Sequence, residues 1–300
     1  MTPLVSTVIP TFNRLADVVI AVRTALAQTY PSQEVIVVDD GSTDGTRDRL
    51  EAEYGQRLTI LRTERLGVSG ARNHGMAAAR GDYLALLDSD DEWLPEKLDA
   101  QVRFLEARPD YGMVVTDVVQ MDRERQAYGL LRRREAIPED GEVLKYVLRQ
   151  PALAPSSALI RRRVLDDVGP FDTSLPTAED LDFHLRVAAR WRIGVIAEPL
   201  TRAMRGHDGL SSLPRTYTDY LAVMERFMAA HPEIPERDRH AGLQAATLRN
   251  LRGLLVSGHL GPAIAVGARA ARRARSLSDM LDLARTAPLA ARAAVRRALR

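Results

Sequence analysis

The sequence has 300 residues, of which 45% are hydrophobic and 27% are charged, and it contains 19 glycines and no cysteine. This composition indicates a folded globular chain, long enough for one large domain and an appendage, and it disfavours disorder. The lack of cysteine excludes disulfides, thiolate catalysis and thiolate metal sites. A bound metal would need oxygen or imidazole ligands, which favours magnesium or manganese.

The formal net charge of +2 is unevenly distributed. The stretch from Pro262 to Arg300 carries nine arginines against Asp279 and Asp282, a local charge of +7, so the rest of the chain carries about −5. No run of about 18 apolar residues predicts a membrane span, and the first residues lack a signal peptide, so we expect a cytoplasmic protein.

The basic C-terminal segment from Ala263 to Arg300 has two interpretations. Its leucines and alanines among arginines would suit the surface of an anionic membrane, at its inner face, or a helical appendage in solution. It lacks interleaved aromatic residues, so nucleic acid is not an expected partner.

The first hundred residues alternate between apolar runs and segments with helical spacing. Four runs predict strands: Leu4 to Pro10, Val35 to Val38, Leu58 to Leu61 and Tyr83 to Leu87. Three segments between them predict helices: Leu15 to Gln28, Thr43 to Glu53 and Ser69 to Ala79. Strands that are apolar throughout and joined by helices predict a parallel sheet covered on both faces. Ligands of such sheets bind beyond the carboxyl ends of the strands.

The pattern continues with less regular spacing. We predict helices over Pro95 to Ala107, Glu142 to Leu148 and Glu179 to Ala189, and strands over Met113 to Met121 and Ser157 to Ile160. After about Ser211 the chain becomes helical and alanine-rich, which predicts a domain boundary there.

The first strand ends in Pro10-Thr11-Phe12-Asn13-Arg14 rather than in a glycine-rich turn, so a dinucleotide-binding fingerprint is missing from its place. Gly70 and Gly75 have the spacing of a phosphate-binding loop, but the lysine and hydroxyl residue that should follow are absent. A plain Rossmann dehydrogenase and a P-loop NTPase are both disfavoured.

The second strand runs into Asp39-Asp40-Gly41-Ser42-Thr43-Asp44. Together with Glu51 this spacing imitates a calcium-binding EF-hand loop, but a strand leads in where an EF-hand needs a helix. Capping of the next helix explains Thr43 or Asp44. It leaves Asp39 and Asp40 available to accept hydrogen bonds from a base or ribose.

Leu87-Asp88-Ser89-Asp90-Asp91 follows the most apolar strand. In an extended chain Asp88 and Asp90 point to the same side. Carboxylates crowded in this way repel one another unless a cation or hydrogen-bond donors neutralise them, so we expect a divalent ion that bridges Asp90 and Asp88 to a diphosphate. An acidic cap for the helix near Pro95 is the plainer alternative, but it needs only one carboxylate.

Three further features have both a functional and a plainer interpretation. Arg72, on the helix opened by Gly67, would steer a phosphate or hold the aspartate loop, or else lie on the surface. Glu179 and Asp180 would supply a general base, or simply satisfy the preference for acidic residues at a helix N-terminus. His207 would bind metal or phosphate, or lie in a surface loop.

In chain order these motifs resemble the family 2 glycosyltransferases, which have the GT-A fold. The matching pieces span about 200 residues: Val8 to Arg14, Val37 to Asp44, Gly67 to Asn73, Leu87 to Asp91, and Glu179-Asp180. The stretch from Val168 to Asp172 also looks like the family's turn before the helix that bears the base. The resemblance stops near Leu213.

The resemblance implies an inverting enzyme that uses a nucleotide-diphosphate sugar and Mn²⁺ or Mg²⁺. It implies that Asp40 hydrogen-bonds the base, that Asp88 and Asp90 form the Asp-x-Asp site, and that Asp180 is the catalytic base. We expect a donor site made of the following residues: Pro10, Thr11, Phe12, Asn13, Arg14, Asp39, Asp40, Gly67, Arg72, Asp88, Ser89 and Asp90. His207 is expected with Asp88 and Asp90 at the metal. Phe12 stands where the family often has tyrosine, which leaves base selectivity open.

The resemblance implies a Rossmann-like, mostly parallel sheet flanked by helices over residues 1–211, and the composition predicts a helical, arginine-rich region over residues 212–300. Residues 1–120 would bind the nucleotide sugar, and residues 121–211 a saccharide or lipid-linked acceptor. Two rivals stay open: a non-catalytic binding module of the same fold, and a sugar nucleotidyltransferase. The latter would be expected to carry a glycine-rich basic loop after the first strand.

Overall fold

The computed structural model describes residues 2–122, 124–131, 143–149, 153–204, 213–256, 258–274, 279–280 and 283. The chain forms two compact units. One, here called the α/β unit, comprises Met1–Val143 and Ala152–His207. The other, the helical unit, comprises Leu144–Pro151 and Asp208–Arg300. His207 was predicted as a metal ligand and lies outside the described residues.

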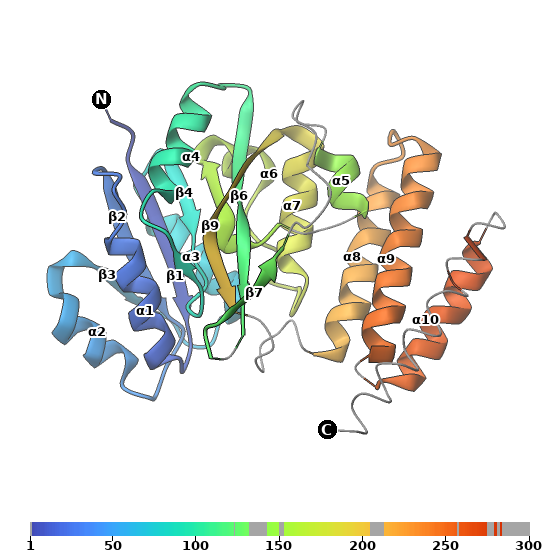
Figure 1. Ribbon diagram of the computed structural model, residues 1–300, viewed down its shortest axis with the longest axis horizontal. Helices are drawn as coiled ribbons and strands as arrows, with labels where there is room; N and C mark the ends of the chain where they lie inside the picture. The colour runs from blue at the N-terminus through green and yellow to red at the C-terminus, as the bar shows by residue number, and fades with distance from the viewer. Residues whose placement is uncertain are drawn as a thin grey trace. The chain divides into compact units, whose positions relative to one another are not determined.

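The α/β unit is built on one mixed sheet (Figure 1). Its described strands are β1 (Val5–Thr11), β2 (Gln33–Asp39), β3 (Thr59–Arg62), β4 (Tyr83–Leu86), β5 (Glu92–Trp93), β6 (Tyr111–Met121), β7 (Ala127–Leu130), β8 (Ala158–Arg161) and β9 (Arg192–Met204). They follow the order β3-β2-β1-β4-β8-β6-β9-β5, with β7 paired to β6. The strands β3, β2, β1 and β4 are parallel, as predicted, and β8 turns the sheet antiparallel. The carboxyl ends of β1, β2 and β4 therefore meet at one edge.

Helices cover both faces of this sheet. They are α1 (Leu15–Leu26), α2 (Thr46–Tyr54), α3 (Gly67–Ala78), α4 (Lys97–Glu106), α6 (Arg162–Val168) and α7 (Glu179–Arg190). Val5 and Ile9 of β1 join a buried cluster with residues of α1, α2 and α4. Val8, which points to the opposite face, lies against α3 at Gly75, where an added Cβ would come within 2.4 Å of Val8 Cγ1. Glycine at this position lets α3 approach the sheet closely.

The 13-residue strand β9 was not predicted, and neither were β5, β7 and α6. Pro199 and charged residues interrupt the apolar pattern of β9. The structure accommodates them with an irregularity: Thr116 of β6 pairs with Ile196, whereas Val118 pairs with Thr201. The intervening residues leave the ladder, which is where a strand tolerates proline.

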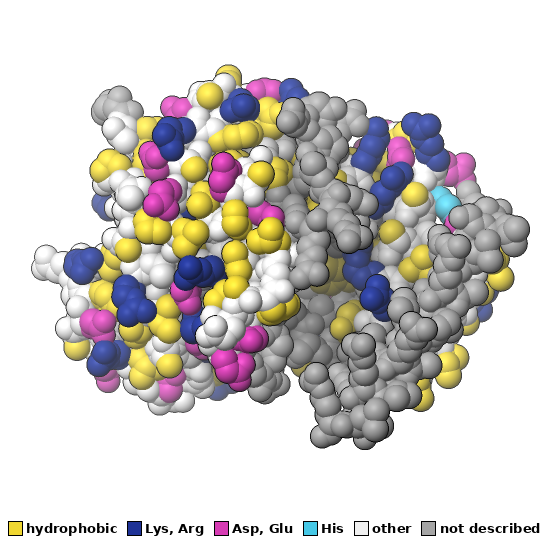
Figure 2. Space-filling view, viewed as in Figure 1, with side chains coloured by type: hydrophobic (Ala, Val, Ile, Leu, Met, Phe, Trp, Pro, Cys, Tyr) yellow, Lys and Arg dark blue, Asp and Glu magenta, His cyan; other side chains and the backbone are white. Residues whose placement is uncertain are grey.

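The helical unit contains α5 (Val143–Arg149), which begins at its boundary, and α8 (Pro214–Ala230), α9 (Glu236–Val256) and α10 (Leu260–Arg273). Leu251 and Leu254 of α9 pack with Ala263 and Val266 of α10. Within the described part of the chain, no helix has both the length and the apolar character to cross a membrane. On the face drawn in Figure 2, basic and acidic side chains are interspersed over the described surface.

Candidate functional site

The loops that follow β1 and β2 are fastened together by Asn13. Its backbone N–H donates to Ser42 Oγ at 2.9 Å, and its Oδ1 accepts the N–H of Thr43 at 2.8 Å. Asn13 has a φ of 50°, a left-handed conformation that asparagine tolerates better than most residues. Asp44 adds a further link, because it accepts the N–H of Leu15 at 3.0 Å.

The two aspartates at the end of β2 have different roles in the structure. Asp40 accepts hydrogen bonds from Thr63 Oγ1 at 2.7 Å, from the N–H of Leu66 at 2.7 Å and from the N–H of Gly67 at 2.8 Å. Both of its oxygens are therefore committed to the turn that opens α3. Asp39 is fully buried, and its Oδ1 accepts the N–H of Ser42 at 2.8 Å. Asp39 Oδ2 accepts no hydrogen bond from the described residues and lies 3.7 Å from Arg62 Nη1, so it is a second candidate for the base contact that the resemblance assigns to Asp40.

Several buried polar atoms at this edge have no hydrogen-bond partner among the described residues: Thr11 Oγ1, Asp39 Oδ2, Ser69 Oγ and Arg72 Nε. Thr11 and Asp39 are neighbours in the register of β1 and β2. Buried polar groups are normally paired, so such a group of unpaired atoms indicates a place completed by a ligand or water. Pro10 lies buried within β1, and the ring of Phe12 stacks under the Arg65 guanidinium at 4.4 Å.

The acidic segment after β4 folds into a turn, in which the N–H of Asp91 donates to the carbonyl of Asp88 at 3.0 Å. The sequence argument assumed an extended segment, and this assumption was wrong. Two arginines contact it: Arg72 Nη2 lies 2.6 Å from Asp88 Oδ1, and Arg14 Nη1 lies 2.7 Å from Asp90 Oδ2. Positive charge from the protein itself thus offsets part of the repulsion between the carboxylates, and Arg72 holds the aspartate loop, one of the two roles proposed for it. Ser89, between the two aspartates, is buried.

The third carboxylate, Asp91, is a structural group. It is 7% exposed and accepts hydrogen bonds from Ser156 Oγ at 2.5 Å and from the N–H of Met204 at 3.0 Å. Burial, and then the charges of Asp90 and Asp88, raise the pKa of Asp91 well above its usual range. Asp91 therefore ties the turn to the loop before β8 and to the end of β9.

Arg72 joins the acidic turn to the start of α7. It is 3% exposed, and its Nη1 lies 2.8 Å from Glu179 Oε1 while its Nη2 bonds Asp88. Burial alone would lower the pKa of Arg72, but Asp88 and Glu179 outweigh it and raise that pKa. Burial raises the pKa of Glu179, and Arg72 offsets this only in part.

A second contact joins α3 to the loop that precedes α7. Asn73 Nδ2 donates to the carbonyl of Phe171 at 2.9 Å, and Asn73 Oδ1 accepts the N–H of Phe171 at 2.9 Å. Asp180, the predicted base, lies in the first turn of α7 next to Glu179, and its Oδ1 accepts the N–H of Leu181 at 2.8 Å. The structure therefore brings the predicted donor-site turn and the predicted base-bearing helix to one place.

The described residues include no cluster of three histidine, aspartate or glutamate side chains that would hold a metal ion unaided. Asp88, with a side chain that is 29% exposed, has a hydrogen-bond partner among the described residues only at Oδ1. Its Oδ2 remains for a ligand. Magnesium and manganese are commonly held by one or two carboxylates together with phosphate oxygens and water, and Asp88 with Asp90 fits that arrangement.

The sequence reasoning missed Ser156, which also accepts the backbone N–H of Asp88 at 3.0 Å. It foresaw neither the bond from Arg14 to Asp90 nor the one from Arg72 to Glu179. The last pair is separated by 107 residues, and local pattern contains no signal for such a contact.

The sequence model of glycosyl transferase family 2 matches residues 6–169. The putative teichuronic acid biosynthesis glycosyltransferase TuaG of Bacillus subtilis is 36% identical over 130 residues, covering 40% of this chain and 52% of that protein. The UDP-Glc:alpha-D-GlcNAc-diphosphoundecaprenol beta-1,3-glucosyltransferase WfaP of Escherichia coli is 38% identical over 104 residues, covering 34% and 41%. An uncharacterized glycosyltransferase of Rickettsia felis is 28% identical over 188 residues, covering 62% and 31%. The chain thus spans between a third and a half of the length of these relatives.

Solved structures share the fold. Residues 1–349 of S. aureus TarS, in complex with UDP-GlcNAc, match with a TM-score of 0.61 and 19% identity, over 88% of each chain. The mannosyltransferase PcManGT from Pyrobaculum calidifontis, in complex with GDP-Man and Mn²⁺, matches with a TM-score of 0.61 and 25% identity, over 97% of this chain and 81% of that one. The α/β unit has the GT-A fold that the motifs implied. Since the family model covers more than half of the residues, this chain belongs to glycosyl transferase family 2.

Proposed function

We propose that this chain is an inverting, metal-assisted glycosyltransferase that moves a sugar from a nucleoside diphosphate sugar to an acceptor hydroxyl. One observation carries the proposal. The buried Arg72 binds Asp88 of the acidic turn and Glu179 beside Asp180, so that the carboxylates for the donor and the carboxylate for the acceptor belong to one site. The buried atoms without a hydrogen-bond partner at the carboxyl ends of β1 and β2 support a ligand at this edge of the sheet.

The nucleotide would occupy the edge formed by β1 and β2. A base N–H would donate to Asp39 Oδ2, which is buried, lies 3.7 Å from Arg62 Nη1 and accepts no hydrogen bond from the described residues, and the base would lie near Phe12. UDP-GlcNAc and GDP-Man are named in the structures of TarS and PcManGT, and this likeness supports a nucleoside diphosphate sugar as the donor. The sugar and the base stay open.

The acceptor hydroxyl would attack the anomeric carbon from the side opposite the diphosphate. Its oxygen forms the new bond to that carbon, the bond to the diphosphate oxygen breaks, and a carboxylate oxygen of Asp180 takes the hydroxyl proton. The first turn of α7 favours the ionised form of Asp180 through the helix dipole. Arg72 and Asn73 hold that turn in position.

Asp88 and Asp90 would hold Mn²⁺ or Mg²⁺, whose charge would offset the negative charge that develops on the leaving diphosphate. Arg14 would then share Asp90 with the metal or release it when the donor binds. Arg72 remains on Asp88 and keeps the turn in shape.

Three variants test the proposal. Asp180→Asn should keep donor binding but lower turnover about a hundred- to ten-thousand-fold, since it removes the general base. Asp182→Asn is the matched control, because Asp182 lies on the same helix in an ion pair with Arg186, and it should retain turnover. Asp90→Ala should lose manganese-dependent donor binding. Donor titration and turnover measurements with UDP, GDP and TDP sugars read out all three; full turnover in Asp180→Asn would exclude Asp180 as the base.

The acceptor would be a saccharide or a lipid-linked sugar in the synthesis of a cell-surface polysaccharide or glycoconjugate. The names of TuaG and WfaP, one for teichuronic acid biosynthesis and one for a diphosphoundecaprenol acceptor, support this class. The helix α10 exposes Leu260 at 64% and Ile264 at 73%, and Arg272 in its last turn is also exposed. These residues would place the chain peripherally on an anionic membrane.

A further inference from the structure

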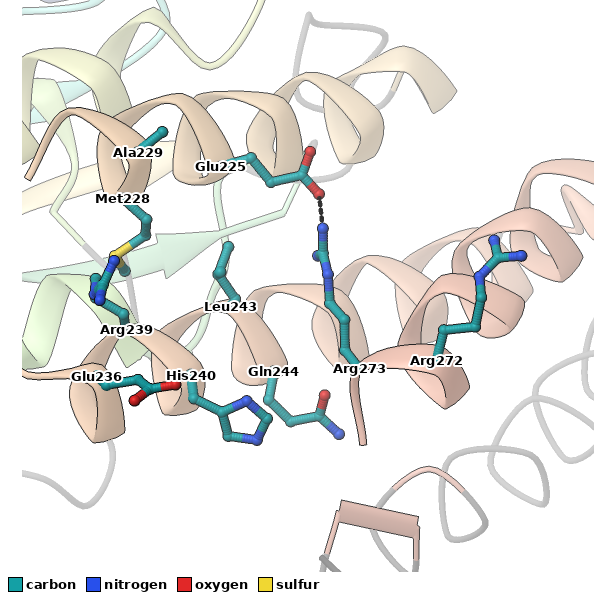
Figure 3. Close-up of a pocket in the computed structure, with 10 residues that line it drawn as sticks. All are labelled: Glu225, Met228, Ala229, Glu236, Arg239, His240, Leu243, Gln244, Arg272 and Arg273. Atoms are coloured by element: carbon teal, nitrogen blue, oxygen red, sulfur yellow. Dashed lines mark hydrogen bonds and ion pairs between the residues drawn. The ribbon is translucent and has the colours of Figure 1, made fainter. Parts of the chain in front are cut away.

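The helical unit contains a cavity of about 550 Å³ between α8, α9 and the end of α10. Figure 3 shows the side chains that line it. The described lining residues on which the argument depends are Glu225 of α8, Glu236, Arg239, His240 and Gln244 of α9, and Arg273 of α10. All of them belong to the helical unit, so the cavity is separate from the donor site of the α/β unit.

Gln244 is the first sign of a ligand. It is 7% exposed, and within the described part of the chain neither its Nε2 nor its Oε1 has a hydrogen-bond partner. A buried carboxamide with both ends unpaired is unfavourable in an apolar helical bundle, where leucine or methionine would fill the same space. Its position in the wall of a cavity means that a bound molecule can complete both ends.

Two arginines contribute further unpaired donors. Arg239 Nε and Arg273 Nη1 are buried and have no partner. Arg273 is held in place because its Nη2 donates to Glu225 (Figure 3). Glu225 also lies 3.5 Å from Arg269. The charge of Glu225 is therefore already balanced. His240 Nε2 lies 3.1 Å from Asp279 Oδ2, and thus has a partner of its own.

The unpaired groups define the chemistry of a ligand. The guanidinium donors and the Gln244 amide require several acceptor oxygens, while Gln244 Oε1 requires one hydroxyl. A phosphate group that carries one proton has this composition, and arginine is the side chain best suited to bind it. We propose that this cavity is a phosphate-binding site. Glu236 also lines it, and its negative charge would favour a phosphate that keeps this proton over a fully deprotonated one.

Binding of inorganic phosphate to the full-length protein, measured by calorimetry with EDTA present, tests the site. Gln244→Leu and Arg239→Gln should each weaken phosphate binding about tenfold or more, because each removes donors to the anion. Arg252→Gln is the control: Arg252 is exposed on the same helix, does not line the cavity, and its loss should leave affinity unchanged. Equal affinity in wild type and both cavity variants, or no phosphate binding at all, would overturn the proposal.

Thermal unfolding without phosphate provides the second readout. Gln244→Leu should unfold at a temperature no lower than wild type, because it removes an unpaired buried amide. If Gln244 had a purely structural role, the substitution would lower the unfolding temperature. A lower unfolding temperature for this variant overturns the proposal. Binding of the protein to vesicles of phosphatidylcholine, with and without phosphatidic acid, identifies the source of the phosphate group. Vesicle binding that depends on both phosphatidic acid and Gln244 indicates a lipid headgroup. Binding of inorganic phosphate without vesicle binding indicates a soluble phosphate.

Discussion

Replacement of Arg72 by methionine should destabilise the α/β unit strongly. The guanidinium is 3% exposed and bonds two carboxylates, of which Glu179 is itself 7% exposed. Without Arg72, Glu179 would be a buried charge with no counter-ion. Breaking a buried ion pair in this way costs about 3–5 kcal/mol of the free energy of unfolding.

Urea denaturation followed by tryptophan fluorescence measures this loss. The two tryptophans of the sequence, Trp93 and Trp191, both lie in the α/β unit, so the signal reports that unit. The matched control is Arg80→Met, since Arg80 forms an exposed ion pair with Glu34 and its side chain is 78% exposed. That control should lose no more than about 1 kcal/mol.

A second variant separates electrostatics from simple loss of packing. If the loss in free energy of unfolding arises because Glu179 is left without a counter-ion, then Arg72→Met combined with Glu179→Met should recover most of it. Replacement of both partners of a buried ion pair by apolar groups is often close to neutral. Two results would refute the reasoning: a free energy of unfolding for Arg72→Met within about 1 kcal/mol of wild type, or a double variant that is as unstable as the single variant.

Three more predictions concern other parts of the chain. Burial and then the charge of Arg72 lower the pKa of His184 to about 3, so below pH about 6.5 the unfolded chain takes up a proton that the folded chain does not. The free energy of unfolding in urea should therefore be about 2 kcal/mol lower at pH 5 than above pH about 6.5, and His184→Gln should abolish that difference. Gly75→Ala should lower the stability of the α/β unit by about 1–3 kcal/mol in the same urea assay, because its Cβ would collide with Val8. Ile264→Asp should reduce co-sedimentation with anionic liposomes, and unchanged co-sedimentation would exclude α10 as the contact.

The first half of the α/β unit was predictable because its strands are apolar throughout. β1, β2 and β4 lie within two residues of their predicted bounds, since a strand buried on both faces leaves little choice of residue type. β9 escaped detection because it is partly exposed and contains Pro199 at an irregular point of the ladder. A pattern with period two is lost where the ladder itself is interrupted.

The candidate site was predictable in its residue types but not in its contacts. Sequence alone placed acidic residues at the ends of β2 and β4, yet it could not tell that Asp40 binds backbone amides while Asp39 Oδ2 accepts no hydrogen bond from the described residues. That distinction depends on where the turn before α3 crosses the end of β2. The link from Arg72 to Glu179 depends on the packing of α3 against the start of α7, which no local spacing encodes.

The membership of α5 in the helical unit has a practical consequence. In chain order α5 comes between β7 and β8, yet Leu148 meets α9 at Gly242 and the carbonyl of Arg149 accepts a hydrogen bond from Arg249. A chain that ends after residue 211 would keep α5 but would lack α9, against which α5 packs. The apolar side chains of α5 would then be exposed on a segment inserted within the sequence of the α/β unit. Point substitutions, rather than truncations, are therefore the sound way to separate the two halves of this protein.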